Sequence, residues 1–343
     1  MLKIAINGFG RIGRMVARQI NDRDDMEIVC VNDLMENLQN LVYLYNYDSN
    51  YGRASEKAVV RGENLISFGK GDIVVTRNSD IMDIEIADKS VDVVIDASGV
   101  ASNAKNGRKL VDTGLTRFTV VTHAPGEGMD KHVIMGVNDG SLDPEIHKCV
   151  SSSICDANAI AHPIKLLEDV YGIEHGFVTT LHPWLSYQNL VDGPVNSQSQ
   201  PAHYWEDFSL GRSSVNAIIP KGTTAVTAIS HVLPEIPSKV QGFSYRIPTG
   251  VVCTADLTLS LKKNVTAEEI NELLERKFSN SKYVALNRES RISVDYEMDS
   301  HSVTLDLQWT AVSGGNTVKL VCWYDNEWGY AARVVDLAYR LSA

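Results

Sequence analysis

Long apolar runs and paired cysteines are both scarce in this sequence of 343 residues. Its longest apolar stretches, such as Val91–Val100, fall far short of the ~20 residues of a membrane-spanning helix, so we expect no contact with a membrane. Its five cysteines form no CxxC pair and no Cys/His cluster of zinc-site spacing. We therefore expect no metal, no disulfide framework and a reducing, cytoplasmic location. The first residues enter a strand pattern directly, so we also expect no signal or transit peptide.

Positive charge is scarce as well. The chain has 32 lysine and arginine residues against 43 aspartate and glutamate residues, a formal net charge of −11. This overall field would repel nucleic acid and anionic lipid, so neither is an expected partner. An anionic substrate is not excluded, but a positive site for it would have to be built locally. The length favours two domains over one.

The first 150 residues alternate apolar strands with helices. Residues 11–20 carry apolar side chains at helical spacing, and a second helical pattern ends at Gly114. Apolar runs of strand length occur at residues 3–6, 27–31, 72–76, 91–97 and 118–122. Such alternation is typical of an α/β fold whose parallel, doubly wound sheet has both faces covered.

The pattern changes after residue 150. A helix is predicted over residues 155–171, and a second helix begins with the capping box of Thr266 and Glu269. Between and after them lie alternating runs at residues 177–183, 241–248, 251–261, 291–296, 302–312 and 317–325. These runs predict an α+β domain with a mixed or antiparallel sheet. The long segment 192–214 has no clear periodicity, and loops of that length are usually functional.

A glycine-rich motif joins the first strand to the first helix. The segment Gly8-Phe9-Gly10-Arg11-Ile12-Gly13 fits the pattern G-x-G-x-x-G, and Asp33 ends the next strand. Glycines let the backbone approach a pyrophosphate, the helix N-terminus stabilises its charge, and the carboxylate accepts from ribose hydroxyls. Asp33 would repel a 2′-phosphate, so the motif predicts NAD, although Arg11 could reduce that preference. The alternative is a turn chosen for tight packing alone.

Cys155 is the cysteine best placed for chemistry. It follows three serines and opens a predicted helix, whose dipole favours a thiolate. His182 ends an apolar strand, where a base could meet a distant thiol. A cysteine is more often structural, and a lone histidine is more often an ordinary core or surface residue. Sequence spacing does not decide whether the two side chains meet.

Six motifs occur in one order along the whole chain: INGFGRIGR (6–14), NDL (32–34), S-x-C-x-x-N (153–158), TTxH (179–182), RIPT (246–249) and WYDNEWGY (323–330). Together they closely resemble the phosphorylating glyceraldehyde-3-phosphate dehydrogenases and their erythrose-4-phosphate relatives. The resemblance implies that Cys155 attacks an aldehyde, that His182 takes the proton, and that inorganic phosphate releases the resulting thioester.

The resemblance also implies a division of the chain and further cofactor contacts. An NAD-binding domain would comprise residues 1–153 and 325–343, with its C-terminal helix packed back on it, and a catalytic domain residues 154–324. Ser98 and Gly99 would border the cofactor, and Asn326 would hold the nicotinamide carboxamide. A homotetramer is the assembly that the family implies.

The sequence departs from the family at its anion sites. Asp156 and Ala157 replace two threonines after the cysteine, Leu185 and Tyr187 replace a threonine and an aspartate, and the segment 192–212 is longer and contains Tyr204 and Trp205. An arginine-rich run is reduced to Arg212, a Thr-Gly pair becomes Thr223-Thr224, and Arg246 is retained. The candidate substrate or anion residues are Ser153, Asp156, Arg212, Thr223 and Arg246.

Asp156 is the departure with the largest electrostatic effect. At ~4 Å and an effective dielectric of about 20, a carboxylate repels each charge of an incoming anion by roughly 4 kcal/mol before screening. It also opposes thiolate formation. Three hypotheses follow. The first is an NAD-dependent aldehyde oxidoreductase with slow phosphate-dependent turnover of glyceraldehyde 3-phosphate. The second is an ordinary glycolytic enzyme whose anion sites are rebuilt from Lys221, Arg212 and Arg246, and the third is a weakly catalytic NAD-binding interaction protein.

Overall fold

The computed structural model describes residues 1–84, 91–194 and 207–342, and their contacts divide the chain into two compact units. The first unit comprises Met1–Val133, Ser141–Ser153 and Ala331–Ala343, and the second comprises Ile134–Gly140 and Ile154–Tyr330. The C-terminal residues thus belong to the same unit as the N-terminus. Within the described ranges, no helix is both long and apolar enough to cross a membrane.

The first unit is built on a sheet of nine strands in the order β10-β11-β9-β8-β1-β2-β7-β6-β5. From β10 to β7 all neighbouring strands are parallel, and β6 and β5 extend the edge in antiparallel fashion. The strands span β1 (Leu2–Asn7), β2 (Met26–Asn32), β5 (Val59–Gly62), β6 (Leu65–Ser67), β7 (Asp72–Thr76), β8 (Val91–Asp96), β9 (Thr116–Val121), β10 (Lys131–His132) and β11 (Cys149–Ser151). The predicted parallel sheet is confirmed.

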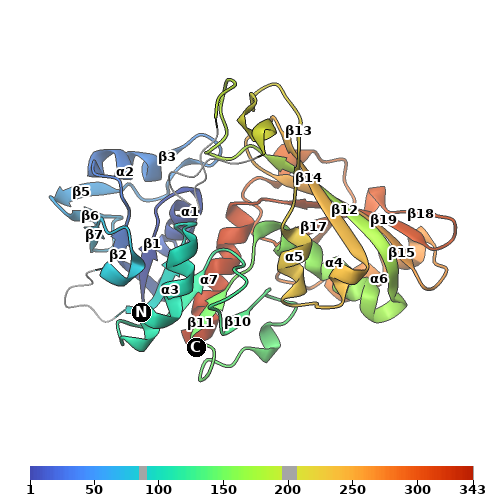
Figure 1. Ribbon diagram of the computed structural model, residues 1–343, viewed down its shortest axis with the longest axis horizontal. Helices are drawn as coiled ribbons and strands as arrows, with labels where there is room; N and C mark the ends of the chain where they lie inside the picture. Colours follow the sequence, from blue (N-terminus) through green and yellow to red (C-terminus); the bar gives the residue numbers. More distant parts are fainter. Residues whose placement is uncertain (85–90, 195–206, 343) are drawn as a thin grey trace. The chain divides into compact units, whose positions relative to one another are not determined.

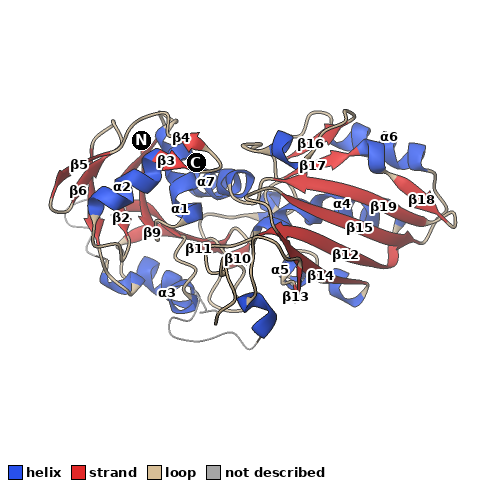
Figure 2. Cartoon of the chain, turned by 90° about the horizontal axis from the view of Figure 1, so that it is seen from above, coloured by secondary structure: helices blue, strands red, loops and turns tan. Residues whose placement is uncertain are grey.

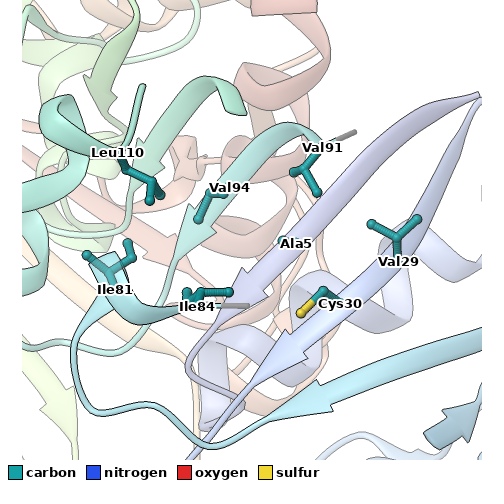
Figure 3. Close-up of a cluster of buried hydrophobic side chains, with 8 residues drawn as sticks. All are labelled: Ala5, Val29, Cys30, Ile81, Ile84, Val91, Val94 and Leu110. Carbon is teal, nitrogen blue, oxygen red and sulfur yellow. The ribbon is translucent and has the colours of Figure 1, made fainter. Parts of the chain in front are cut away.

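Helices pack on both faces of this sheet. Alternate residues of a strand point to opposite faces. Ala5 lies in a buried cluster with Leu110 of helix α3 (Ala101–Asp112), as Figure 3 shows. The next residue, Ile6, lies beside Gly13 of helix α1 (Arg11–Asn21) on the other face. The sheet is therefore doubly wound, as its continuous apolar strands predict.

Several smaller elements of the first unit were not predicted from the sequence. They are strands β5, β6, β10 and β11, helix α2 (Leu38–Asn46), and the short strands β3 (Tyr47–Asp48) and β4 (Gly52–Arg53). Asn37 caps the N-terminus of helix α2, and its side chain accepts the N–H of Gln39.

The second unit contains a mixed sheet in the order β13-β14-β12-β15-β19-β17-β16, with β18 paired to β19. Strands β12 and β14 are parallel, and β15 and β19 run antiparallel to their neighbours (Figure 2). The strands span β12 (Ile173–Pro183), β13 (Ile219–Gly222), β14 (Val240–Ile247), β15 (Cys253–Leu261), β16 (Val284–Asn287), β17 (Val303–Asp306), β18 (Ala311–Ser313) and β19 (Thr317–Tyr324). The mixed sheet and the α/β fold class are as predicted.

Helices α4 and α5 of this unit pack against the sheet (Figure 1). The helices span α4 (Cys155–Tyr171), α5 (Ala225–Ser230), α6 (Ala267–Phe278) and α7 (Trp328–Ser342), the last of which continues into the first unit. The run at residues 291–296 was wrongly predicted as a strand. It forms a 3-10 turn over Ser293–Tyr296, because the Asp295 carboxylate accepts the N–H of Ile292 and closes the chain locally.

The capping box of α6 gives a stability prediction. The Thr266 hydroxyl accepts the N–H of Glu269 over 3.2 Å, and the Glu269 carboxylate accepts the N–H of Thr266 over 2.7 Å. We expect Thr266→Ala to lower the free energy of unfolding by about 1 kcal/mol in urea titrations. The control Thr227→Ala removes an exposed threonine in α5. Equal stability of the two variants would contradict the prediction.

Candidate functional site

The glycine-rich loop after β1 is shaped by close backbone contacts. Gly8 has a φ of +91°, and a Cβ there would lie 2.6 Å from the Cα of Ser98. A Cβ on Gly13 would lie 2.0 Å from the carbonyl oxygen of Gly8. A Cβ on Gly10 would meet no atom within 4 Å, so packing does not require glycine there. This open space at the start of α1 fits the close approach of a pyrophosphate.

Asp33 follows β2 beside this loop. Its carboxylate accepts the N–H of Phe9 over 2.7 Å and that of Met35 over 2.9 Å. These bonds fix a carboxylate that can also accept from ribose hydroxyls. Arg11 forms an ion pair with Asp48, so its charge is not left to attract a 2′-phosphate. The arrangement fits NAD.

Ser98 and Gly99 follow β8, the strand next to β1. The Ser98 hydroxyl donates to Asp96 over 2.7 Å, and Gly99 has a φ of +70° with no atom within 4 Å of a Cβ built there. Ile12 lies in the first turn of α1, where backbone N–H groups have no partner within the helix. These backbone groups and the open space beside Gly99 are suited to an anionic cofactor.

Cys155, Asp156 and His182 converge in the second unit. The cysteine sulfur, a carboxylate oxygen of Asp156 and a ring nitrogen of His182 all lie within 4.8 Å of one another. Cys155 and Asp156 are the first two residues of α4, which packs against β12, β15 and β19. His182 comes from the end of β12, so helix packing brings together residues that are far apart in the sequence.

Asp156 is buried and held from two sides. Its Oδ1 accepts the hydroxyl of Tyr324 over 2.8 Å and the thiol of Cys155 over 3.5 Å. Burial raises the pKa of Cys155 well above its ordinary value, and the Asp156 charge raises it further. Burial and the same carboxylate raise the pKa of Tyr324, which therefore stays a neutral hydrogen-bond donor.

His182 is poised as a neutral base. Its Nδ1 lies 2.7 Å from the carbonyl oxygen of Pro183, which can only accept, so Nδ1 carries the proton and Nε2 is the acceptor. Burial and the neighbouring Arg246 lower the pKa of His182 to about 4. The imidazole is therefore uncharged at neutral pH.

Two cations act on the same site. Arg246 pairs with His182 in the register of β14 and β12, and Lys221 lies opposite Ser244, two residues before Arg246. Alternation along β14 directs Ser244 and Arg246 to one face, so Lys221 points to that face too. The pKa of Lys221 is lowered by burial and by Arg246, and Asp156 opposes this shift.

Arg246 has unused hydrogen-bonding capacity. It donates to the Tyr187 hydroxyl over 3.4 Å, and its buried Nε has no hydrogen-bond partner among the described residues. Thr223 lies near Gly242 of the same strand, and its hydroxyl accepts the N–H of Ala225. One side of the sheet thus offers the guanidinium of Arg246, the ammonium of Lys221 and the hydroxyl of Thr223. All three groups can donate hydrogen bonds to an anionic oxygen.

The other candidate residues are placed differently. Asn326 is buried, and its Oδ1 accepts the N–H of Val252, a residue with a φ of +69°. Ser153 is buried with a φ of +61°, and its N–H donates to Ser151. Arg212 is two-thirds exposed and forms an ion pair with Asp192 over 2.7 Å. Tyr204 and Trp205 lie outside the described residues.

Tyr324 is the site residue that the sequence reasoning did not find. It lies in the motif WYDNEWGY, which was considered only for Asn326. Its alternation with Cys322 along β19 places it on a buried face, and this was the available signal.

The donors of Cys155, Asp156 and His182 are also of a kind that binds a divalent cation. Because the positive charges of Arg246 and Lys221 act on the same groups, we assign these donors to nucleophilic and acid–base chemistry instead.

A dinucleotide-binding sheet and a thiol beside a neutral imidazole define a class, the NAD-dependent oxidoreductases. Comparison with known proteins agrees. Residues 2–104 match the glyceraldehyde 3-phosphate dehydrogenase NAD binding domain, and residues 154–326 match the C-terminal domain of the same enzymes. The chain belongs to the glyceraldehyde-3-phosphate dehydrogenase family. It is an NAD-dependent aldehyde oxidoreductase.

Full-length relatives show the same similarity. The chain is 35% identical to glyceraldehyde-3-phosphate dehydrogenase 2 of Bacillus subtilis, over 100% of this chain and 97% of the relative. It is 36% identical to the Geobacillus stearothermophilus glyceraldehyde-3-phosphate dehydrogenase, over 98% and 97% of the two chains. It is also 36% identical to glyceraldehyde-3-phosphate dehydrogenase 1 of Kluyveromyces marxianus, over 98% of both.

The glycine-rich loop gives a matched pair of variants. In Gly13→Ala, the new methyl group would collide with the backbone of Gly8, and we expect a loss of about 3 kcal/mol in the free energy of unfolding. In Gly10→Ala, the methyl group meets no protein atom, so the unfolding midpoint should be kept while the Kd for NAD rises at least about tenfold. Calorimetry measures both quantities. Wild-type NAD affinity of Gly10→Ala would contradict the proposed cofactor position.

Asp156→Asn tests the electrostatics at Cys155. Removing the carboxylate removes a charge that disfavours the thiolate, so the pKa of Cys155 should fall. We expect the pH midpoint of alkylation by iodoacetamide to move down by about one unit or more. Asp169→Asn, at the exposed end of the same helix, should leave it unchanged. An unchanged or raised midpoint in Asp156→Asn would show that the carboxylate does not act on the sulfur.

Proposed function

We propose that this protein oxidises an aldehyde bearing an anionic group, through a thioester on Cys155. The observation that supports this most strongly is the approach of the cysteine sulfur and a His182 ring nitrogen to within 4.8 Å. The sulfur lies at the first turn of a 17-residue helix, whose N-terminus stabilises negative charge on the attacking atom.

The chemistry assigned to this chain begins with a thiol and a neutral imidazole. Nε2 of His182 accepts the proton of Cys155 as the sulfur attacks the aldehyde carbon, because Nδ1 is already protonated and held by Pro183. The raised pKa of Cys155 makes this proton transfer part of the attack rather than a step completed in the resting enzyme.

The proposed NAD contacts follow the loop geometry. The pyrophosphate would lie at Gly8–Gly13, the ribose at Asp33, and the adjoining backbone at Ser98 and Gly99. Asn326 would hold the nicotinamide carboxamide. Its side chain is fixed by the hydrogen bond that Oδ1 accepts from the N–H of Val252. NAD, when bound, supplies the acceptor for the electrons of the aldehyde.

The proposed substrate subsite is the group of Lys221, Thr223 and Arg246. Arg246 has a buried Nε without a partner among the described residues, and Lys221 shares its face of the sheet. A phosphate on the aldehyde is the group that these donors suit best. Arg212, in its exposed ion pair with Asp192, and Ser153 stay secondary candidates.

Two other proposals concern the setting of the enzyme. Five free cysteines favour action in a reducing cytoplasm. We also propose a homotetramer, on the ground of family membership. The ordinary glycolytic enzyme is the second candidate function, and Lys221 is the observation that favours it, because this cation adds positive charge near Arg246.

A rapid-mixing experiment tests the thioester route. Wild-type protein with NAD and glyceraldehyde 3-phosphate, erythrose 4-phosphate or glyceraldehyde should release one NADH per subunit in an initial burst. Cys155→Ala should abolish this burst, and His182→Asn should slow it by about 10²- to 10⁴-fold. Cys149→Ala, which removes a buried thiol of the first unit, should retain it. A full burst in Cys155→Ala would show that the nucleophile is elsewhere.

A further inference from the structure

We propose that water, rather than inorganic phosphate, releases the acyl group from Cys155, and that Asp156 is the general base for this step. The inference rests on the proposed function, because it requires the Cys155 thioester. It names an acyl acceptor other than the inorganic phosphate that the family resemblance implies.

The position of Asp156 suits a base for this step. Its Oδ1 lies 3.5 Å from the sulfur that would carry the acyl group, and the Tyr324 hydroxyl fixes that oxygen over 2.8 Å. The second carboxylate oxygen of Asp156, Oδ2, takes part in neither of these two hydrogen bonds. A water bonded to the carboxylate would lie beside the acyl carbon, where a general base must act.

The charge of Asp156 selects between the two acceptors. An incoming phosphate dianion is repelled by a buried carboxylate, whereas a neutral water is oriented by it. By the family resemblance, Leu185 also stands in place of a threonine, and its N–H donates to Gln188. Both changes weaken the case for an acceptor phosphate.

The two cations of the site, Arg246 and Lys221, can together bind one anionic group. Burial lowers the pKa of His182, and the basic residues Arg246 and Lys221 lower it further. They lie on neighbouring strands and on one face of the sheet, so they form one positive cluster. If the substrate's own anionic group occupies that cluster, an acceptor phosphate has to enter against Asp156. Among the described residues, the other candidate cation, Arg212, is already paired with Asp192.

The step balances with the groups present. Water forms the new C–O bond and gives its proton to Asp156, the C–S bond breaks, and the electron pair leaves with the sulfur. The sulfur then takes the proton back from Asp156 across their 3.5 Å contact, which regenerates the thiol. The carboxylic acid product loses its own proton to solvent. No oxidant is needed beyond the NAD that formed the thioester.

The test is NADH formation in phosphate-free buffer, with the aldehyde that gives the burst. We expect wild-type protein to continue through many turnovers, with added phosphate changing the steady rate less than twofold. Asp156→Asn should keep the burst amplitude and lose at least about tenfold in the steady rate. Asp169→Asn, a carboxylate at the other end of α4, should match the wild type. A merely misfolded variant would lose the burst as well.

Asp156→Thr distinguishes a lost base from a lost structure. It restores the neutral hydroxyl of the family, and we expect it to turn over slowly in water but to gain at least fivefold when phosphate is added. Wild-type turnover that stops after one NADH per subunit and resumes with phosphate would overturn the water proposal and leave the thioester intact. Absence of the burst with all three aldehydes would instead count against the proposed function.

Discussion

The hydrogen bond from the Tyr324 hydroxyl to Asp156 is the interaction on which the chemistry of this site depends. It holds a buried carboxylate next to the Cys155 sulfur. Tyr324 can do this because it ends β19 on the buried face of the sheet against which α4 packs. The sheet therefore fixes the electrostatics of the nucleophile.

A carboxylate at this position has opposite effects on the two halves of the reaction. It adds to the effect of burial in raising the pKa of Cys155, so the attack on the aldehyde depends on proton transfer to His182. It also provides a base and proton carrier when the acyl group leaves. Burial, together with the cations of Arg246 and Lys221, lowers the pKa of His182, so its imidazole is neutral before the attack.

The strand and helix patterns predicted most of the fold because apolar periodicity reports burial directly. The parallel sheet and helix α4 agree with those patterns, and residues 291–296 failed because Asp295 closes a local turn that periodicity does not reveal. The approach of Cys155 to His182 was beyond spacing arguments, since it depends on how α4 packs on β12. The partner of Asp156 was missed for the same reason, because 168 positions separate it from Tyr324.

The most direct test of the central claim is the lifetime of the acyl group on Cys155, followed by intact-protein mass spectrometry after rapid mixing with NAD and aldehyde without phosphate. We expect an acyl adduct on Cys155 that decays to unmodified protein at a rate independent of phosphate concentration, and that persists longer in Asp156→Asn. An adduct that stays until phosphate is added, or one that forms on another residue, would contradict the role assigned to Asp156 and Cys155.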